Sequence, residues 1–266
     1  MYLLKKHSGG ISLVNNVKYV ANISMFARIP QCPISYWVSH NFMELIAPKQ
    51  TIKEISNPCI GMRTGDNDRF LRLWYEVGYD KLSSVCKSIE TDDYMSHKWV
   101  PYNKGGNFRR WYGNNEYVVN WENNGEEIKE NTRLHYGDNI GWKISNEKYY
   151  FQQGITWGAI TSAITSFRYY DKGFIFSNSG QAIIMNNDAN IYSLLAFLNT
   201  TIIRDVLKII CPTLSLESGY VAKLPYKEEI ITNGKTAEIS KENTDISKKD
   251  WDCFETSWDF KKHPLI

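Results

Sequence analysis

Residues 190–211, NIYSLLAFLNTTIIRDVLKIIC, carry the strongest fold signal in the chain. Their apolar side chains recur at three- and four-residue spacing, which predicts one amphipathic helix over 190–211. Pro212 follows, and proline stops a helix because it has no backbone N–H and clashes with the preceding turn. Asn199, Arg204 and Asp205 within the segment exclude a membrane-spanning helix. We therefore expect this helix to pack its apolar face against a globular domain.

Short β-rich runs on the N-terminal side of this helix indicate a sheet. Strands are expected at 70–77, 117–119, 149–152, 167–170 and 174–176, separated by Gly and Asp turns. A short helix is expected from Ser35 to Ala47, a helix plus loop at 122–146, and a strand or helix running into a Gly turn at 51–65. The predicted fold class is α/β (α+β), with a mixed sheet and one long helix after it.

Composition divides the chain into three parts. Residues 1–35 are a lead-in segment, 36–226 form a single globular domain that includes the helix, and 227–266 are a polar linker with a partly extended aromatic tail. The linker interpretation rests on the Lys, Glu, Thr, Ser and Asn content of 226–250. The tail carries Trp251, Phe254 and Trp258, which are expected to be exposed.

Charge and cysteine content limit the function classes. Lys and Arg total 31 against 29 Asp and Glu, so no global basic field is present and any nucleic-acid site must be local. Five dispersed cysteines without a C-x-x-C pair fit neither a disulfide framework nor a zinc ribbon. With no secretory leader and no 18-residue apolar run, the sequence predicts a cytoplasmic protein without a membrane partner.

No catalytic motif is complete. Asn57-Pro58-Cys59-Ile60 lacks the second proline and the aromatic residue of an amino-methyltransferase N-P-P-Y/F loop, and a turn is the better interpretation. Glu126, Glu127 and Lys129 resemble a metal-dependent hydrolytic cluster but fit a solvated helix face better. We therefore expect no catalytic residue, no metal site and no cofactor in this chain.

The most informative chemical signal is a basic and aromatic cluster over 97–112, a stretch with no acidic residue. Arginine forks suit guanine edges and phosphates, lysine supplies point charge, and aromatic rings stack or wedge. The candidate DNA-binding residues in it are Lys98, Lys104, Arg109, Arg110 and Trp111. An alternative stays open. In it, Trp99, Phe108 and Trp111 are core residues, and the basic side chains of the cluster lie on a solvated hairpin.

Two further basic positions complete the set of candidate DNA contacts. Arg63 lies with Arg69 and Arg72 around a Gly turn, although acidic residues are interspersed there. Arg168 lies between Phe167 and Tyr169 in a predicted strand.

Five strings, in this order, resemble one known family. They are GMRTGDNDRFLRLWYEV, KWVPYNKGGNFRRWYGNNEYVVNWENNG, ITWGAITSAITSFRYYDKGFIFSNSG, LLAFLNTTIIRDVLKIICPTLSLESGYVAKLP and DWDCFETSWDFKKHPL. Over roughly residues 30–266 they resemble the region downstream of the catalytic domain in BREX-type (PglX) adenine-specific DNA methyltransferases. That region is similar to target-recognition domains of type IIG restriction-modification enzymes and type I specificity subunits.

The resemblance implies a target-recognition domain that binds double-stranded DNA in a phage-defence system. It implies that 190–211 is a spacer helix, followed by a short strand ending at Leu224-Pro225. It also places the S-adenosylmethionine-binding core and its N-P-P-Y/F loop upstream of the matched region, so the cofactor is expected only in that core.

Two alternatives remain at this stage. A protein-interaction fragment would dock on a separate methyltransferase or defence-system subunit through the apolar helix and the cluster of Trp251, Phe254 and Trp258; plain core packing is the simpler explanation for the helix. An enzyme such as a nuclease would rely on a site that is not visible as a local motif.

Overall fold

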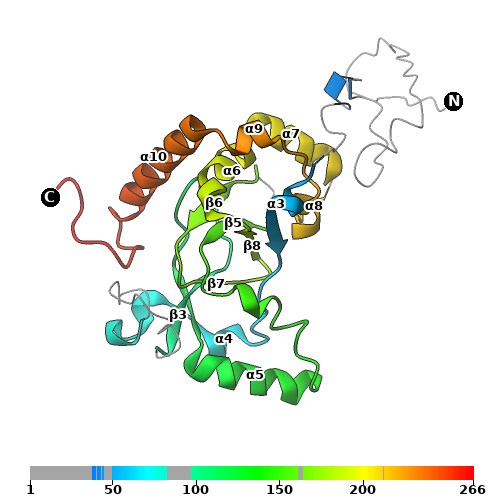
Figure 1. Ribbon diagram of the computed structural model, residues 1–266. Helices are drawn as coiled ribbons and strands as arrows, with labels where there is room; N and C mark the ends of the chain where they lie inside the picture. The colour runs from blue at the N-terminus through cyan, green and yellow to red at the C-terminus, as the bar shows by residue number, and fades with distance from the viewer. Residues whose placement is uncertain are drawn as a thin grey trace, which may run out of the picture.

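The computed structural model describes residues 38–39, 41–42, 44, 50–82, 97–160, 164–211 and 213–266. They form two four-stranded sheets flanked by helices, which confirms the α+β class (Figure 1). Helices α6, α7, α9 and α10 gather at one end of the molecule and α5 lies at the other, with the strands between them. The expected lead-in at 1–35 and most of the helix expected at 35–47 lie outside the described residues.

The first sheet has the strand order β1-β8-β5-β6 and is antiparallel throughout. Its strands are β1 (Ser56–Cys59), β5 (Gly154–Gly158), β6 (Phe167–Tyr170) and β8 (Gly180–Met185). Pro58 pairs with Ile183 at the edge of the sheet, where a residue without a backbone N–H is tolerated.

The second sheet has the order β2-β4-β3-β7. Its strands are β2 (Leu71–Leu73), β3 (Trp99–Asn103), β4 (Tyr117–Asn120) and β7 (Ile175–Phe176). The β3–β7 pair is parallel and the others are antiparallel, so the predicted mixed sheet is present.

Strand β8 joins the two hydrophobic cores. All six of its residues are buried. Ile183 and Met185 belong to the core beneath the helices, whereas Ala182 and Ile184 belong to the core shared with the second sheet. Because successive side chains on a strand point to opposite faces, this alternation places β8 in a middle layer.

The predicted single helix over 190–211 is two helices, α6 (Ile191–Leu198) and α7 (Thr201–Ile210). Asn199 breaks the helix because its side chain exchanges hydrogen bonds with the backbone of Phe167, accepting from N at 3.1 Å and donating to O at 3.0 Å. Thr200 then caps α7 by accepting from the N–H of Ile203. The two helices keep the apolar periodicity across the break.

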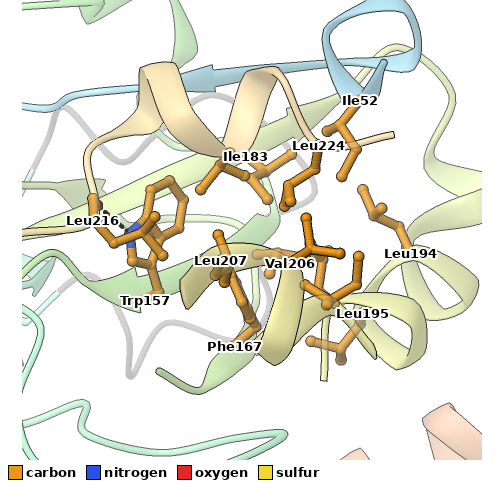
Figure 2. Packing of buried hydrophobic residues seen from close by; sticks show 14 of the residues in the cluster. Ile52, Trp157, Phe167, Ile183, Leu194, Leu195, Val206, Leu207, Leu216 and Leu224 are labelled. Carbon is orange, nitrogen blue, oxygen red and sulfur yellow. Dashed lines mark hydrogen bonds between the residues drawn. The ribbon is translucent and has the colours of Figure 1, made fainter. Parts of the chain in front are cut away.

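Both helices bury their apolar faces, as Figure 2 shows for Leu194, Leu195, Val206 and Leu207. Shorter helices complete this core: α3 (Ile52–Ile55), α8 (Ser218–Ala222) and α9 (Glu228–Ile231).

The strand expected before Pro225 is therefore wrong; α8 occupies that segment, and Pro225 forms only an isolated bridge with Thr51. Trp157 of β5 donates from Nε1 to the carbonyl of Leu216 at 2.9 Å (Figure 2).

The interpretation of 226–250 as a linker is wrong, because Gly234–Trp251 forms α10, an 18-residue helix that packs along α6. Asn233 caps it by accepting from the N–H of Thr236. Its buried positions are small or polar, namely Ser240 and Thr244, and end in Trp251. A stripe of small residues has helical spacing but little hydrophobicity, so the periodicity search missed it.

The remaining strand predictions are confirmed in part. The strands at 117–119, 167–170 and 174–176 are present, as is the helix at 122–146, which is α5 (Glu122–Tyr136) followed by loop. The run at 70–77 divides into the end of α4 (Asn67–Phe70), β2 and the 3-10 helix η1 (Trp74–Glu76). The strand expected at 149–152 is wrong, because η5 (Glu147–Tyr149) and turns occupy it.

Gly61 provides a test of how β1 and β7 are joined. Its N–H donates to the carbonyl of Ser177, and a Cβ at this position would overlap the carbonyl oxygen of Phe176. We expect Gly61→Ala to lower the free energy of unfolding by about 1–3 kcal/mol, measured by urea denaturation. Gly234→Ala is the matched control, because a Cβ there would meet none of the described atoms within 4 Å; its expected effect is under about 1 kcal/mol. Equal stability of the two variants would contradict the tight contact.

Candidate nucleic-acid interface

Three loops meet where the two sheets join. They are the loop after β1, the loop after β3 and the loop between β7 and β8. Met62 N donates to Phe176 O at 2.9 Å, Asn178 N donates to Met62 O at 3.2 Å, and Ser177 N donates to Asn103 O at 3.0 Å. These backbone bonds fix the three loops relative to one another.

The loops enclose an open cavity of about 290 Å³. Hydroxyl, amide and cationic side chains dominate its lining: Arg63, Thr64, Gly65, Asn67, Tyr102, Lys104, Ser177, Asn178 and Ser179. Two of the predicted DNA contacts, Arg63 and Lys104, therefore reach the same cavity from different sheets.

The two cations are available to an anionic ligand. Lys104 Nζ lies 4.5 Å from the ring centroid of Tyr117, and neither Lys104 nor Arg63 forms a salt bridge with any residue that the structure describes. Tyr102 donates its hydroxyl to Met62 O at 2.9 Å, and burial raises the pKa of this phenol well above its usual range. The phenol of Tyr102 thus stays neutral, and the positive charge of the cavity lining comes from Arg63 and Lys104.

Gly105 brings the β3 loop close to the β7–β8 loop. Its φ is +92°, in the region that favours glycine, and a Cβ there would lie 2.9 Å from the carbonyl oxygen of Ser179. A side chain at this position would push the loop carrying Lys104 away from Ser179.

Arg168 lies beneath this loop and is only 2% exposed. Its guanidinium donates to Gly105 O at 3.2 Å and to Arg109 O at 3.5 Å. Burial, and secondarily repulsion from Arg109, lowers its pKa to about 10. The predicted direct DNA contact by Arg168 is not supported, because the side chain supports the loop from inside.

Two other predicted contacts are engaged within the chain. Arg109 pairs with Asp250 at 3.1 Å and lies over the Trp251 ring at 4.9 Å, which ties the basic loop to α10. Lys98 pairs with Glu122 at 2.9 Å. Both side chains are partly exposed, so these pairs contribute little stability, but they compete with a phosphate for each cation.

The aromatic residues of the cluster divide between core and surface. Trp99 is buried, as the core alternative predicts, whereas Phe108 is 53% exposed with the Arg110 guanidinium 5.6 Å from its ring centroid. Trp111 is partly buried, has φ +72° and forms a parallel bridge to Arg168. Phe108 thus remains at the surface, and Arg110 beside it is partly buried.

The other two arginines near Arg63 do not line the cavity. Arg69 pairs with Glu127 at 2.7 Å. Arg72 donates to the carbonyls of Asp68 and Leu71.

The incomplete catalytic motifs lie in structural positions. Asn57 to Cys59 belong to β1 and pair with β8, so the expected turn is wrong. Burial raises the pKa of the Cys59 thiol to about 12. Glu127 is partly exposed and pairs with Arg69, which agrees with the expected solvated helix face. Lys129 does not, because its side chain is only 14% exposed, pairs with Glu147 and lies 5.1 Å from the Trp121 ring centroid.

Within the described ranges, no cluster of three or more His, Cys, Asp or Glu side chains is arranged to hold a metal ion. Over the same residues, none of the helices combines the length and the apolar character needed to cross a bilayer.

Sequence reasoning missed the part of the cavity lining that the loop between β7 and β8 supplies, namely Ser177, Asn178 and Ser179. No local signal marks them, because an isolated Asn or Ser in a loop is ordinary turn chemistry. They become a group only when β1, β3 and β7 are placed side by side.

The chain is homologous to part of the adenine-specific methyltransferases. This homology confirms the resemblance that the sequence indicated. The chain is 36% identical over 254 residues to the adenine-specific methyltransferase PglX of Lacticaseibacillus casei (strain Zhang), covering 94% of this chain and 20% of that protein. It is 35% identical over 250 residues to the adenine-specific methyltransferase BrxX of Escherichia coli O9:H4 (strain HS), covering 91% of this chain and 18% of that protein. The chain thus spans about a fifth of the length of these relatives. No protein-family model matches it.

Replacing the buried guanidinium tests its role in holding the loop. Arg168→Met keeps the apolar stem but leaves the carbonyls of Gly105 and Arg109 without their donor, so the loop should open more often. We expect amide hydrogen exchange at residues 105–111 to accelerate roughly 5- to 150-fold while exchange in β8 is unchanged. Arg133→Met on the exposed face of α5 is the control. Unaltered exchange at 105–111 would show that Arg168 does not hold the loop.

Proposed function

We propose that this chain is a sequence-specific double-stranded DNA recognition region of an adenine-specific methyltransferase, acting in a phage-defence system of the BREX or restriction-modification type. The observation that carries the proposal is the convergence of Arg63 and Lys104, from two different sheets, on one polar cavity. The names of the two relatives support the methyltransferase context.

The cavity offers the two kinds of contact that DNA recognition requires. Arg63 and Lys104 supply positive charge for backbone phosphates, which fixes the register of the protein on the duplex. Asn67 and Asn178 supply amide groups, which can pair with the edge of adenine. Arg110, beside the exposed Phe108, would extend the basic surface along the same loop.

Catalysis is assigned to another part of the methyltransferase. S-adenosylmethionine would be held there, and the present chain would position that enzyme on its target, most simply in the cytoplasm with the chromosome. The sheet pairing of Asn57 to Cys59 supports this division, because these backbone groups are bonded to β8 rather than presented to a flipped base.

The alternative of a protein-docking fragment receives less support. The helices α6 and α7 use their apolar faces in the chain's own core, and Trp251 is 4% exposed within it. Trp258 packs against the core between the sheets, which leaves Phe254 as the exposed member of the tail cluster.

Selection from a randomised duplex pool at about 0.15 M salt tests the proposal directly, because non-specific phosphate binding is already weakened at that concentration. Enrichment of a short asymmetric motif is the expected result. Retention of unselected DNA would contradict autonomous recognition and would favour docking on a catalytic subunit. Methyl incorporation from labelled S-adenosylmethionine by this chain alone would contradict the proposed division of labour.

The two cavity cations can be tested one at a time. We expect Arg63→Ala and Lys104→Ala each to weaken duplex binding and to lower the slope of log K against log salt by about 0.9, because each removes one phosphate contact. Fluorescence anisotropy between 50 and 200 mM salt measures both quantities. Lys235→Ala, an exposed lysine on α10, should change neither. A slope that is unaltered in both cavity variants would rule out this cavity as the phosphate site.

A further inference from the structure

A pair of exposed aromatic rings lies at the end of α5, outside the cavity and outside the residues that the sequence singled out. Tyr136 is 48% exposed and Trp142 is 46% exposed. Their rings meet edge to face, with centroids 5.3 Å apart. The Lys143 ammonium lies 4.3 Å from the Tyr136 centroid and 4.8 Å from the Trp142 centroid. We call Tyr136, Trp142 and Lys143 the aromatic platform.

The aromatic platform is fixed to the protein core. Ile144 is buried between the sheets, and Ile140 packs against the same core. Lys143 N and Ile144 N both donate to Ile140 O at 2.9 Å, which closes the turn. Ile140 and Ile144 therefore hold the turn that carries Trp142 and Lys143.

One backbone hydrogen bond joins the aromatic platform to the cavity. Arg63 N donates to Lys143 O at 2.8 Å. The Arg63 side chain lines the cavity, so Lys143 is the backbone neighbour of a cavity residue. A ligand that extends from Arg63 toward this turn would reach Lys143.

The charge of this region favours an anionic partner. From Arg133 to Lys143 the chain carries two cations, Arg133 and Lys143, against one acidic residue, Asp138. The Lys143 ammonium beside the rings of Tyr136 and Trp142 suits a ligand that has both negative charge and a flat or apolar face. Nucleotides have both features.

We propose that the aromatic platform is a second DNA contact, which packs against a base or deoxyribose beside the phosphates held by Arg63 and Lys104. The inference rests on the proposed function, and it extends the proposed DNA-binding surface beyond the cavity. Tyr136 and Trp142 would supply the apolar contact, and Lys143 would supply charge to the adjoining phosphate.

The test uses the 266-residue chain and a fluorescein-labelled 30-base-pair duplex of mixed sequence, with anisotropy measured from 50 to 200 mM salt. Trp142→Ala should weaken binding roughly 5- to 150-fold with an unchanged salt slope, because the apolar contact of the ring with a deoxyribose or a base step releases no counterions. Trp142→Phe keeps an aromatic face and should retain most of the affinity. Lys143→Ala should lower the slope by about 0.9.

Tyr79→Ala is the matched control, because Tyr79 is also exposed, at 56%, and lies on η2 (Tyr79–Lys81). Thermal unfolding verifies that each variant is folded, and Tyr136→Ala gives a second measurement if Trp142→Ala is unstable. Failure of the unmodified chain to bind the duplex even at 50 mM salt would overturn the proposed function itself, because non-specific phosphate binding is strongest at low salt. Normal duplex binding by the unmodified chain and equally by Trp142→Ala and Tyr136→Ala would overturn only the platform, and would assign these rings to a protein partner.

Discussion

The burial of β8 on both faces is the constraint on which the rest of the structure depends. A strand in a middle layer must satisfy two cores at once, so Ile183 and Met185 face the helices while Ala182 and Ile184 face the second sheet. A shift of one residue in its register would exchange these sets and put small and large side chains in the wrong layers. The pairing of β8 with β1 and β5 therefore fixes where both neighbouring strands end.

The candidate interface follows from this constraint. Because β7 and β8 belong to different sheets, the short loop at 177–179 must cross between them, and its backbone bonds draw in the loops after β1 and β3. Arg63 and Lys104 are the side chains that these loops carry outward. Arg168 works from the opposite direction, since its buried guanidinium binds the carbonyls of the same β3 loop from below.

The basic cluster illustrates how one sequence signal can contain several physical roles. Lys98 and Arg109 pair with carboxylates, and Arg109 also packs on Trp251, so α10 is connected to the basic loop rather than separated from it by a linker. Arg110 is partly buried and lies over the exposed ring of Phe108. Some cations of the cluster are paired with residues distant in sequence, as Arg109 is with Asp250, and others are open to a ligand. The spacing of residues within the cluster does not reveal which cations are paired.

The sequence by itself determined the α+β class, the apolar face of 191–210, the local strands such as 167–170, and the homology to adenine-specific methyltransferases, because periodicity and residue strings are local properties. It placed Arg63 and Lys104 among the candidates on chemistry alone. Only the tertiary structure decided that these two share a cavity, that Arg168 is buried, that Asn199 divides the long helix and that small residues bury α10 against α6. Each of these depends on contacts between segments far apart in the chain, and such contacts leave no periodic trace in the sequence.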